Sequence, residues 1–247
     1  MRIDLNADVG EGLPSDEELI PLVSSVNVAC GAHAGDESTI VRTIELARAA
    51  SVSIGAHPGY PDPEGFGRRE LGIAPDALED SLAEQLRLVS RLVLEHGERL
   101  RHVKPHGALY NRAAEDRGVA DLVCRVVAAT LPDAMLVGLA GSTFLEVGRI
   151  RRLRVCGEAF ADRVYEPSGR LRPRALPGAL LEEPSEAAAQ AVSIARDGRI
   201  RASDGSWLKV RAETLCVHGD TPGAPAVARA VRSALESAGI AVAPLAS

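Results

Sequence analysis

The sequence has few aromatic residues and no surplus of positive charge. Phe, Trp and Tyr make up 3% of the 247 residues, which leaves few side chains that could stack on nucleic-acid bases. Lys and Arg total 28 against 34 Asp and Glu, a formal net charge of -6, whereas proteins that follow a phosphate backbone are usually strongly basic. We therefore expect no nucleic acid among the partners of this chain.

Long apolar runs are also missing. No stretch approaches the ~20 apolar residues that span a bilayer, and residues 1–8 lack the apolar core of a signal peptide. We therefore expect no membrane segment and a cytoplasmic location. The four cysteines, at positions 30, 124, 156 and 216, show no CxxC spacing, so reduced thiols are expected rather than disulfides or a thiolate zinc site.

Short apolar segments alternate with longer amphipathic ones along the whole chain. The candidate strands are residues 3–7, 26–30, 52–56, 102–104, 135–138, 154–156 and 214–217. Strand–helix alternation of this kind predicts a mostly parallel sheet, either a barrel or a doubly wound sheet. No linker, repeat or low-complexity tract divides the chain, so we expect one α/β domain over residues 1–247.

The clearest helix is expected between about Asp76 and His96, where apolar residues recur at spacings of three and four. Asp76 with Glu79 fits a capping box, and Gly97 stands where a C-terminal glycine belongs. A last helix is expected to begin with the Thr221-Pro222 pair, as N-cap and first-turn proline.

Polar side chains with catalytic potential come at the ends of the candidate strands. In parallel α/β folds, ligands bind at the carboxyl ends of the strands, because the loops that follow the strands meet there. The residues concerned are Asn6 and Asp8 at the first strand, His33 and Asp36 after the second, His57 after the third, Lys104 and His106 at the fourth, Glu158 after the sixth, and His218 and Asp220 after the last. Four of the six histidines belong to this set, which predicts one shared pocket.

Two kinds of chemistry fit these side chains. Asp8, His57 and His106 are a natural ligand set for a divalent metal, with an open position for an activated water. The same side chains fit general acid and base catalysis without a metal, and the sequence does not separate the two. A Ser–His–Asp nucleophile is less well supported, because no G-x-S-x-G elbow occurs, and neither familiar phosphate-binding loop is present.

Several of these residues also have a simple structural explanation. Asp36 suits the N-cap of a following helix, and His33 suits a hydrogen bond within its own loop. Arg68 and Arg69 suit either an anion-binding lid or a solvated surface. Residues 57–71 and 161–184 are rich in loop residues, and we expect both stretches to lie over one face of the fold.

Seven motifs of the sequence resemble those of the LamB/YcsF family. They are DLNADVGE (4–11), NVACGAHAGD (27–36), GAHPGYPD (55–62), GFGRR (65–69), VKPHGALYN (103–111), EAFADR (158–163) and CVHGDTPGA (216–224). The motifs occur in family order, so the resemblance covers almost the whole chain. Residues 25–27 read Ser-Val-Asn where Ser-Ala-Asn is expected, a difference in packing and not in chemistry.

The resemblance implies both a fold and an activity. The implied fold is a distorted seven-stranded β/α barrel, TIM-like and related to polysaccharide-deacetylase-like enzymes. The implied activity is the opening of 5-oxo-L-proline to L-glutamate, coupled to hydrolysis of ATP to ADP and phosphate. The resemblance also implies two partner subunits, B and C, and ATP with Mg, which the partner subunits could bind. Whether the barrel holds a divalent metal stays open.

The chemistry of such a substrate assigns roles to the polar residues. A lactam is an unactivated amide, and phosphorylation of its carbonyl oxygen would make the carbon a better electrophile. Water addition then needs a base, the developing charge needs donors, and the ring nitrogen needs a proton. The expected roles are Asp8 or His57 as the base, His106 or His218 as the acid, and Lys104 as the stabiliser of negative charge.

The substrate carboxylate calls for a guanidinium, which binds it through two parallel hydrogen bonds. Arg68, Arg69 and Arg163 are the candidates for this contact. The remaining residues expected to bind substrate are Asn6, His33, Glu158 and Asp220.

Two other functions compete with this one. The Asp and His set also fits a stand-alone, metal-dependent amidohydrolase or deacetylase that acts on a carbohydrate-like substrate, and a metal assay would discriminate it. A binding subunit without catalytic residues, which presents oxoproline to its partners, would keep full activity when every acid and base candidate is mutated.

Overall fold

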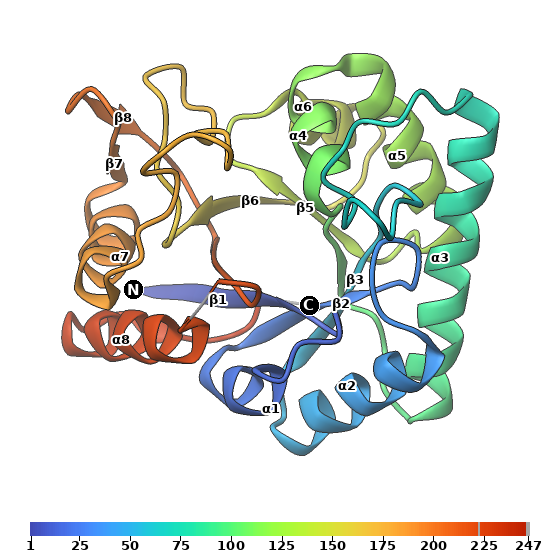
Figure 1. Ribbon diagram of the computed structural model, residues 1–247, viewed down its shortest axis with the longest axis horizontal. Helices are drawn as coiled ribbons and strands as arrows, with labels where there is room; N and C mark the ends of the chain where they lie inside the picture. Colours follow the sequence, from blue (N-terminus) through green and yellow to red (C-terminus); the bar gives the residue numbers. More distant parts are fainter. Residues whose placement is uncertain (222, 246–247) are drawn as a thin grey trace.

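The computed structural model describes residues 1–221 and 223–245. Its centre is a closed barrel of parallel strands in the order β1-β2-β3-β4-β5-β6-β9, closed by the pairing of β9 with both β6 and β1. Figure 1 looks into this barrel. The barrel strands are β1 (Arg2–Val9), β2 (Ser25–Ala29), β3 (Ser53–His57), β4 (His102–Val103), β5 (Met135–Leu139), β6 (Val155–Phe160) and β9 (Thr214–His218). The seven-stranded barrel is confirmed, and the doubly wound sheet is excluded.

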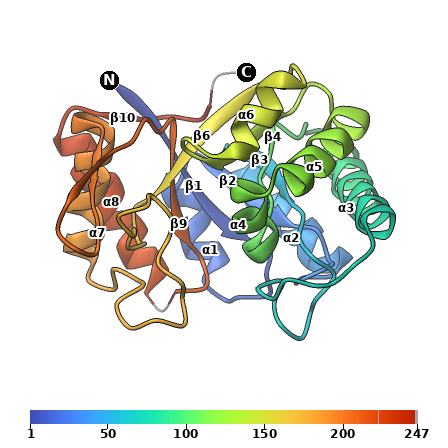
Figure 2. The same ribbon diagram turned by 90° about the horizontal axis from the view of Figure 1, so that it is seen from above.

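Helices cover the outside of the barrel (Figures 1 and 2). They are α1 (Asp16–Leu19), α2 (Glu37–Ala49), α3 (Pro75–Glu95), α4 (Gly107–Glu115), α5 (Arg117–Thr130), α6 (Thr143–Ile150), α7 (Pro184–Val192) and α8 (Ala224–Ser237). The smaller elements are η1 (Ile20–Leu22), η2 (Ser193–Asp197), the hairpin of β7 (Arg199–Arg201) and β8 (Trp207–Lys209), and β10 (Ala241–Val242) beside β1. Among the described helices, none combines the length and apolarity that crossing a bilayer requires.

The N-terminal caps of α3 and α2, both predicted from the sequence, have different outcomes in the structure. The leucines and valines of α3 at the predicted spacing are buried, but the expected capping box is wrong. The helix begins at Pro75 after Ala74, with no side-chain cap, because alanine at the N-cap position has no side-chain oxygen that could accept a hydrogen bond from the first turn. Asp36 is confirmed as the N-cap of α2, since its side chain accepts a hydrogen bond from the backbone N–H of Thr39.

The last helix begins slightly later than predicted. Gly223 is the N-cap of α8, and the first helical residue is Ala224. Pro222, expected in the first turn, lies outside the described residues. All four cysteines are buried and form no disulfide, as expected.

Strands β1 and β6 run two or more residues past their predicted ends, which places Asp8 and Glu158 inside the barrel wall. Asn6 and Asp8 belong to β1, and Glu158 belongs to β6, whereas the sequence placed Glu158 after its strand. Successive strand residues point to opposite faces, so Asn6 and Asp8 share one face with Asp4. All four side chains are buried. The barrel therefore encloses a polar layer beneath its carboxyl end.

Two long loops lie over that end of the barrel (Figure 2). One joins β3 to α3, and the other joins β6 to α7. They meet at a single carboxylate, because Arg68 of the first loop and Arg174 of the second both form ion pairs with Asp220, which follows β9. The expectation that both stretches lie over one face is thus confirmed.

The packing between strands β3 and β4 depends on a glycine. A Cβ atom built on Gly55 would lie 2.2 Å from Nε2 of His102, the atom that hydrogen-bonds to Oδ1 of Asn27 at 2.8 Å. Gly55→Ala is therefore expected to lower the free energy of unfolding by about 1–3 kcal/mol, because the buried imidazole must leave its partner. Urea unfolding measures this as a lower transition midpoint.

Gly72→Ala is the matched control, since nothing lies within 4 Å of a Cβ atom at this position. Its midpoint should equal that of the wild type. An unchanged midpoint for Gly55→Ala would show that His102 can move aside at no cost, against this description of the barrel interior.

Candidate active site

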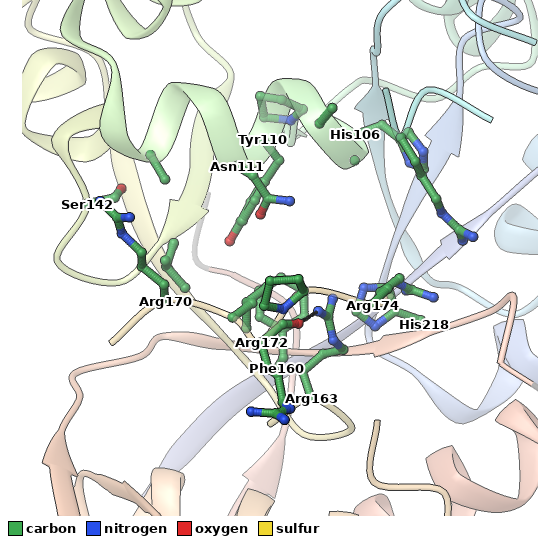
Figure 3. A pocket seen from close by; sticks show the side chains of 18 of the residues that line it. His106, Tyr110, Asn111, Ser142, Phe160, Arg163, Arg170, Arg172, Arg174 and His218 are labelled. Atoms are coloured by element: carbon green, nitrogen blue, oxygen red, sulfur yellow. Dashed lines mark hydrogen bonds between the residues drawn. The ribbon is translucent and has the colours of Figure 1, made fainter. Parts of the chain in front are cut away.

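A cavity of about 1040 Å³ opens at the carboxyl ends of the strands (Figure 3). Eight of the residues predicted from the sequence line this cavity: Asp8, His57, Arg68, Lys104, His106, Arg163, His218 and Asp220. Asn6, His33 and Glu158 are buried and contact members of this lining from behind. The structure therefore brings nearly all of the predicted residues together around one space.

Arg69 is the exception. Its guanidinium pairs with Asp62, with Nε at 3.1 Å from Oδ2, and it is absent from the cavity lining. The reason is the turn at Phe66 and Gly67, where the backbone φ angles are +54° and +63°. This turn directs Arg68 toward Asp220 and leaves Arg69, also predicted to bind substrate, outside this cavity and paired with Asp62.

Lys104 occupies the closed end of the cavity. Its side chain is 2% exposed, and Nζ lies 2.9 Å from Oδ1 of Asp8 and 2.9 Å from Oε1 of Glu158. It also lies 3.1 Å from Sγ of Cys216. Burial disfavours the charged amine, but these neighbours, Asp8 first among them, outweigh it and raise the pKa of Lys104 well above its usual value. The closed end thus holds a permanent ammonium.

The two carboxyl groups beside Lys104 differ in their protonation. Burial works against the charge of Asp8, but His57 and Lys104 overcome this effect and hold its pKa well below the usual range. Burial dominates at Glu158 and raises its pKa. Two neighbouring carboxyl groups with oppositely shifted pKa values are typical of sites that carry out acid–base chemistry.

A layer of side chains below Lys104 fixes these groups in place. Asn6 donates from Nδ2 to Glu158 at 2.9 Å and to Oγ1 of Thr214 at 2.7 Å, and its Oδ1 accepts from Asn27 at 2.7 Å. Asn27 also donates to Oδ1 of Asp8 at 2.8 Å. Asn27 and Thr214 were not predicted from the sequence as site residues, although the alternation of polar residues along β1 was a signal that polar partners must face them.

Two histidines face each other beside Asp8. His57 donates from Nδ1 to the carbonyl oxygen of Lys104 at 2.7 Å, and His106 donates from Nε2 to that of Phe66 at 2.8 Å. Their remaining nitrogens, Nε2 of His57 and Nδ1 of His106, lie 3.0 Å apart. Because both rings already use one N–H on a carbonyl, this hydrogen bond needs one further proton on the pair.

Asp8 faces this pair from the side of His57. Oδ2 of the ionised Asp8 lies 3.4 Å from Nε2 of His57, and burial and the neighbouring His57 hold the pKa of His106 well below its ordinary value. His33 stacks on His106 with ring centroids 3.8 Å apart, which closes the back of the pair. The histidine pair is therefore placed to deliver a proton, and Asp8 to accept one.

Glu11 lies next to this pair and was not predicted from the sequence as a site residue. Its Oε1 is 3.5 Å from Nδ1 of His106 and 3.6 Å from Nε2 of His33, and this oxygen has no hydrogen-bond partner. Burial and the charge of Asp8 raise the pKa of Glu11 to about 7. The available signal was its place in the first motif, two residues after the end of β1.

His218 is held on the opposite side of the cavity. Asp162 accepts hydrogen bonds from the backbone N–H of His218 at 2.9 Å and from Nδ1 at 3.0 Å. Phe160 stacks on the imidazole with ring centroids 5.2 Å apart. With Nδ1 engaged, Nε2 is the nitrogen that His218 offers to a ligand. Asp162 was not predicted as a positioning residue, although it follows the sixth strand closely.

Two groups of described side chains have donor atoms close enough together to hold a metal ion. They are Asp8 with Cys216 and His218, and Glu11 with His33 and His106. Within each group the donor atoms lie within 4.8 Å of one another. Asp8, His57 and His106, the trio predicted from the sequence, do not form one of these groups. Asp8 belongs to the first group, His106 belongs to the second, and His57 belongs to neither.

The model of the LamB/YcsF family matches residues 3–247. The chain belongs to the LamB/YcsF family. A curated relative from Chloroflexus aggregans, named as the A subunit of 5-oxoprolinase, is 49% identical over 98% of both chains.

Solved structures give the same relationship and a more distant one. The lactam utilization protein from Thermus thermophilus has a TM-score of 0.93 and 45% identity, over 99% of this chain and 100% of that chain. A family 4 carbohydrate esterase from Streptomyces lividans has a TM-score of 0.55 with 8% identity, over 99% and 93% of the two chains. The second likeness shows the fold alone, and it agrees with the deacetylase-like barrel expected from the family.

Removal of the buried ammonium tests the electrostatic description of the site. Lys104→Met leaves Asp8 and Glu158 without their cation, and we expect unfolding to become easier by about 3–5 kcal/mol. The loss should be larger at pH 8 than at pH 5. Without the ammonium, the folded pKa of Glu158 rises further above its unfolded value, so the folded variant binds an extra proton and loses stability as the pH rises.

Urea unfolding at the two pH values measures this difference. The double variant Lys104→Met with Glu158→Gln should recover part of the stability at pH 8, because it removes one of the two unpaired carboxyls. Equal destabilisation at both pH values would contradict the assignment of a charged Lys104 between two carboxyl groups.

Proposed function

We propose that this chain is the A subunit of an ATP-dependent 5-oxoprolinase, which opens 5-oxo-L-proline to L-glutamate together with subunits B and C. In the proposed reaction, ATP is hydrolysed to ADP and phosphate. The observation that carries the proposal is an ammonium, an ionised carboxylate and a histidine pair at the closed end of one cavity. The chain that holds them is 49% identical to a relative named as the A subunit of 5-oxoprolinase.

The chemistry needs two waters and one proton transfer to nitrogen. Phosphorylation of the lactam carbonyl oxygen makes the ring carbon electrophilic, and the first water adds to that carbon. The ring C–N bond then breaks, the nitrogen leaves as an amine, and the second water converts the remaining acyl phosphate to a carboxylate and phosphate. A base for water, an acid for nitrogen and a fixed positive charge are therefore required.

The geometry favours one assignment of these roles. Asp8 is ionised and lines the cavity, so it is the base for water. His57 and His106 share a hydrogen bond and both line the cavity, so this pair supplies the acid for the ring nitrogen. Lys104 stabilises the negative charge that develops on oxygen. His218, fixed by Asp162, faces the substrate from the opposite wall; because burial lowers its pKa, its Nε2 is the alternative proton acceptor.

The substrate carboxylate finds cationic partners nearer the mouth of the cavity. Arg68 and Arg163 both line it, and each offers the planar pair of N–H donors that suits a carboxylate. Arg163 is buried, and its hydrogen bonds to the carbonyl oxygens of Ala179 and Arg172 hold its guanidinium in place. We therefore assign the carboxylate to one of these two arginines.

Asp8→Asn tests the assignment of the base. The substitution keeps the shape of the side chain and removes its basicity, so kcat should fall by about 100-fold or more, the range typical of general bases. Release of glutamate from 5-oxo-L-proline with ATP, in the complex reconstituted with subunits B and C, measures the change. Asp121→Asn on α5 is the matched control, since Asp121 pairs with Arg151 on the outer helices, and its kcat should be unchanged.

Other outcomes would support other functions. Wild-type kcat in Asp8→Asn and also in Lys104→Ala would favour a subunit that only presents the substrate. Hydrolysis by the chain alone, without ATP and abolished by a chelator, would favour a metal-dependent amidohydrolase that uses one of the two donor groups. The proposed function requires activity only with all three subunits and ATP.

A further inference from the structure

The two ends of the cavity carry different charge. At the closed end, the single ammonium of Lys104 faces the carboxyl groups of Asp8, Glu11 and Glu158. The outer wall is rich in guanidinium groups, and its arginines are Arg68, Arg163, Arg170, Arg172 and Arg174. The last four are labelled around the cavity in Figure 3. We call these five residues the arginine wall; Arg68 and Arg163 are the two that the sequence predicted to bind the substrate carboxylate.

Part of this positive charge is not neutralised by the protein. Arg68 and Arg174 share one carboxylate, Asp220. Arg163 directs its hydrogen bonds to two backbone carbonyl groups. Burial and the nearby Arg174 lower the pKa of Arg163 to about 10, and the same two causes lower the pKa of Arg68. Arg174 therefore repels both Arg68 and Arg163, and a bound anion would stabilise all three guanidiniums.

The other two arginines of the wall each have a carboxylate of their own. Arg170 pairs with Glu115 at 2.8 Å, and Arg172 pairs with Glu166 at 2.7 Å. The surplus of positive charge therefore lies around Arg174, whose charge lowers the pKa of both Arg68 and Arg163. A bound anion would therefore gain most of its electrostatic stabilisation from Arg174.

The facing wall also suits an anion. The N-terminal residues of α4 and α6 line the cavity, Gly107 in α4 and Ser142 with Thr143 at the start of α6. The first N–H groups of a helix have no intrahelical partner and attract negative charge. The N–H of Ala108 in α4 already donates to the carbonyl oxygen of Gly67, and that of Leu145 in α6 to Oγ of Ser142, so these ends attract an anion through their helix dipoles and their other first-turn N–H groups. Between these helix ends and the arginines, the buried side chain of Tyr110 lines the cavity, with its hydroxyl beside Glu158.

The size of the cavity leaves room for a second ligand. Pockets of roughly 300–1,000 Å³ hold drug-sized molecules, and this cavity measures about 1040 Å³. A five-membered lactam bound at Lys104, with its single carboxylate on Arg68 or Arg163, would leave the other four arginines of the wall without a ligand. A ligand of several linked anionic groups would fill the remaining space and satisfy the guanidiniums.

We propose that the arginine wall binds the phosphate groups of a nucleoside triphosphate, so that ATP is bound by this chain itself. The inference rests on the proposed function for the identity of the nucleotide. Arg174 contacts the phosphates opposite the N-termini of α4 and α6, and the terminal phosphate points toward the lactam at Lys104. This arrangement serves in place of the phosphate-binding loops that the sequence lacks, and it removes the need for a partner subunit to bind ATP.

Calorimetric titration of the isolated full-length chain tests the proposal. The probes are ATP, inorganic tripolyphosphate and adenosine, at low ionic strength. ATP and tripolyphosphate should both bind, and adenosine should not, because the phosphates supply the contacts. Arg174→Gln should weaken the binding of both polyphosphates by about tenfold or more, the effect of one lost charge-assisted contact. Arg91→Gln, which changes an arginine of α3 paired with Glu37 and Glu95, should bind like the wild type.

Kinetics of the reconstituted complex separate this inference from the proposed function. Arg174→Gln should raise the KM for ATP. If the complex opens 5-oxo-L-proline but Arg174→Gln leaves both ATP binding and this KM unchanged, ATP is bound elsewhere and the inference fails while the function stands. If the complex shows no oxoprolinase activity but the chain binds tripolyphosphate through Arg174, the function fails while the phosphate site stands.

A docking role for the arginine wall predicts a different result. In that case Arg174→Gln would weaken the association with subunits B and C in analytical ultracentrifugation, and it would leave tripolyphosphate binding unchanged. That outcome would also overturn the inference. Thermal melting of the variant, expected at the wild-type temperature because Arg174 lies in a surface loop, shows that a change in binding is not a change in folding.

Discussion

The buried contact of Lys104 with Asp8 and Glu158 is the interaction on which the rest of the site depends. An ammonium that is 2% exposed is tolerated only when carboxylates and further hydrogen bonds compensate its lost hydration. Strands β1 and β6 supply the carboxylates, and the chain that follows β4 supplies the amine. Closure of the barrel brings these strands around one point. The polar layer of Asn6 and Asn27 then gives each charged group a fixed direction.

The chemistry follows from how charge is distributed around this contact. His57 and Lys104 keep Asp8 ionised, and His57 shares a hydrogen bond with His106 beside it. An acceptor and a donor of protons thus stand side by side, and both side chains are buried. Electrostatic interactions between buried groups are stronger than in water. Farther out, the guanidinium groups provide the opposite environment, suited to the anionic parts of a ligand.

The barrel strands and most of the lining could be predicted from the sequence, because both depend on local patterns. Strand–helix alternation and the position of polar residues at strand ends pointed to Asp8, His57 and Lys104. Contacts between distant segments left no such pattern. Nothing local distinguishes Arg68 from Arg69, since only the turn at residues 66 and 67 decides which of them faces the cavity. The arginines at 172 and 174 lie in an irregular loop without periodicity, so their place in the lining appears only in the structure.

The central claim is that the closed end of this cavity binds 5-oxo-L-proline and opens its ring. A crystal structure of the chain with 5-oxo-L-proline, at a concentration that saturates binding in solution, tests this claim most directly. We predict the lactam carbonyl oxygen within hydrogen-bond distance of Nζ of Lys104, the ring nitrogen on the side of His57, and the carboxylate on Arg68 or Arg163. A ligand bound outside the cavity, or bound with its carboxylate on Lys104 and its lactam toward the solvent, would contradict the claim.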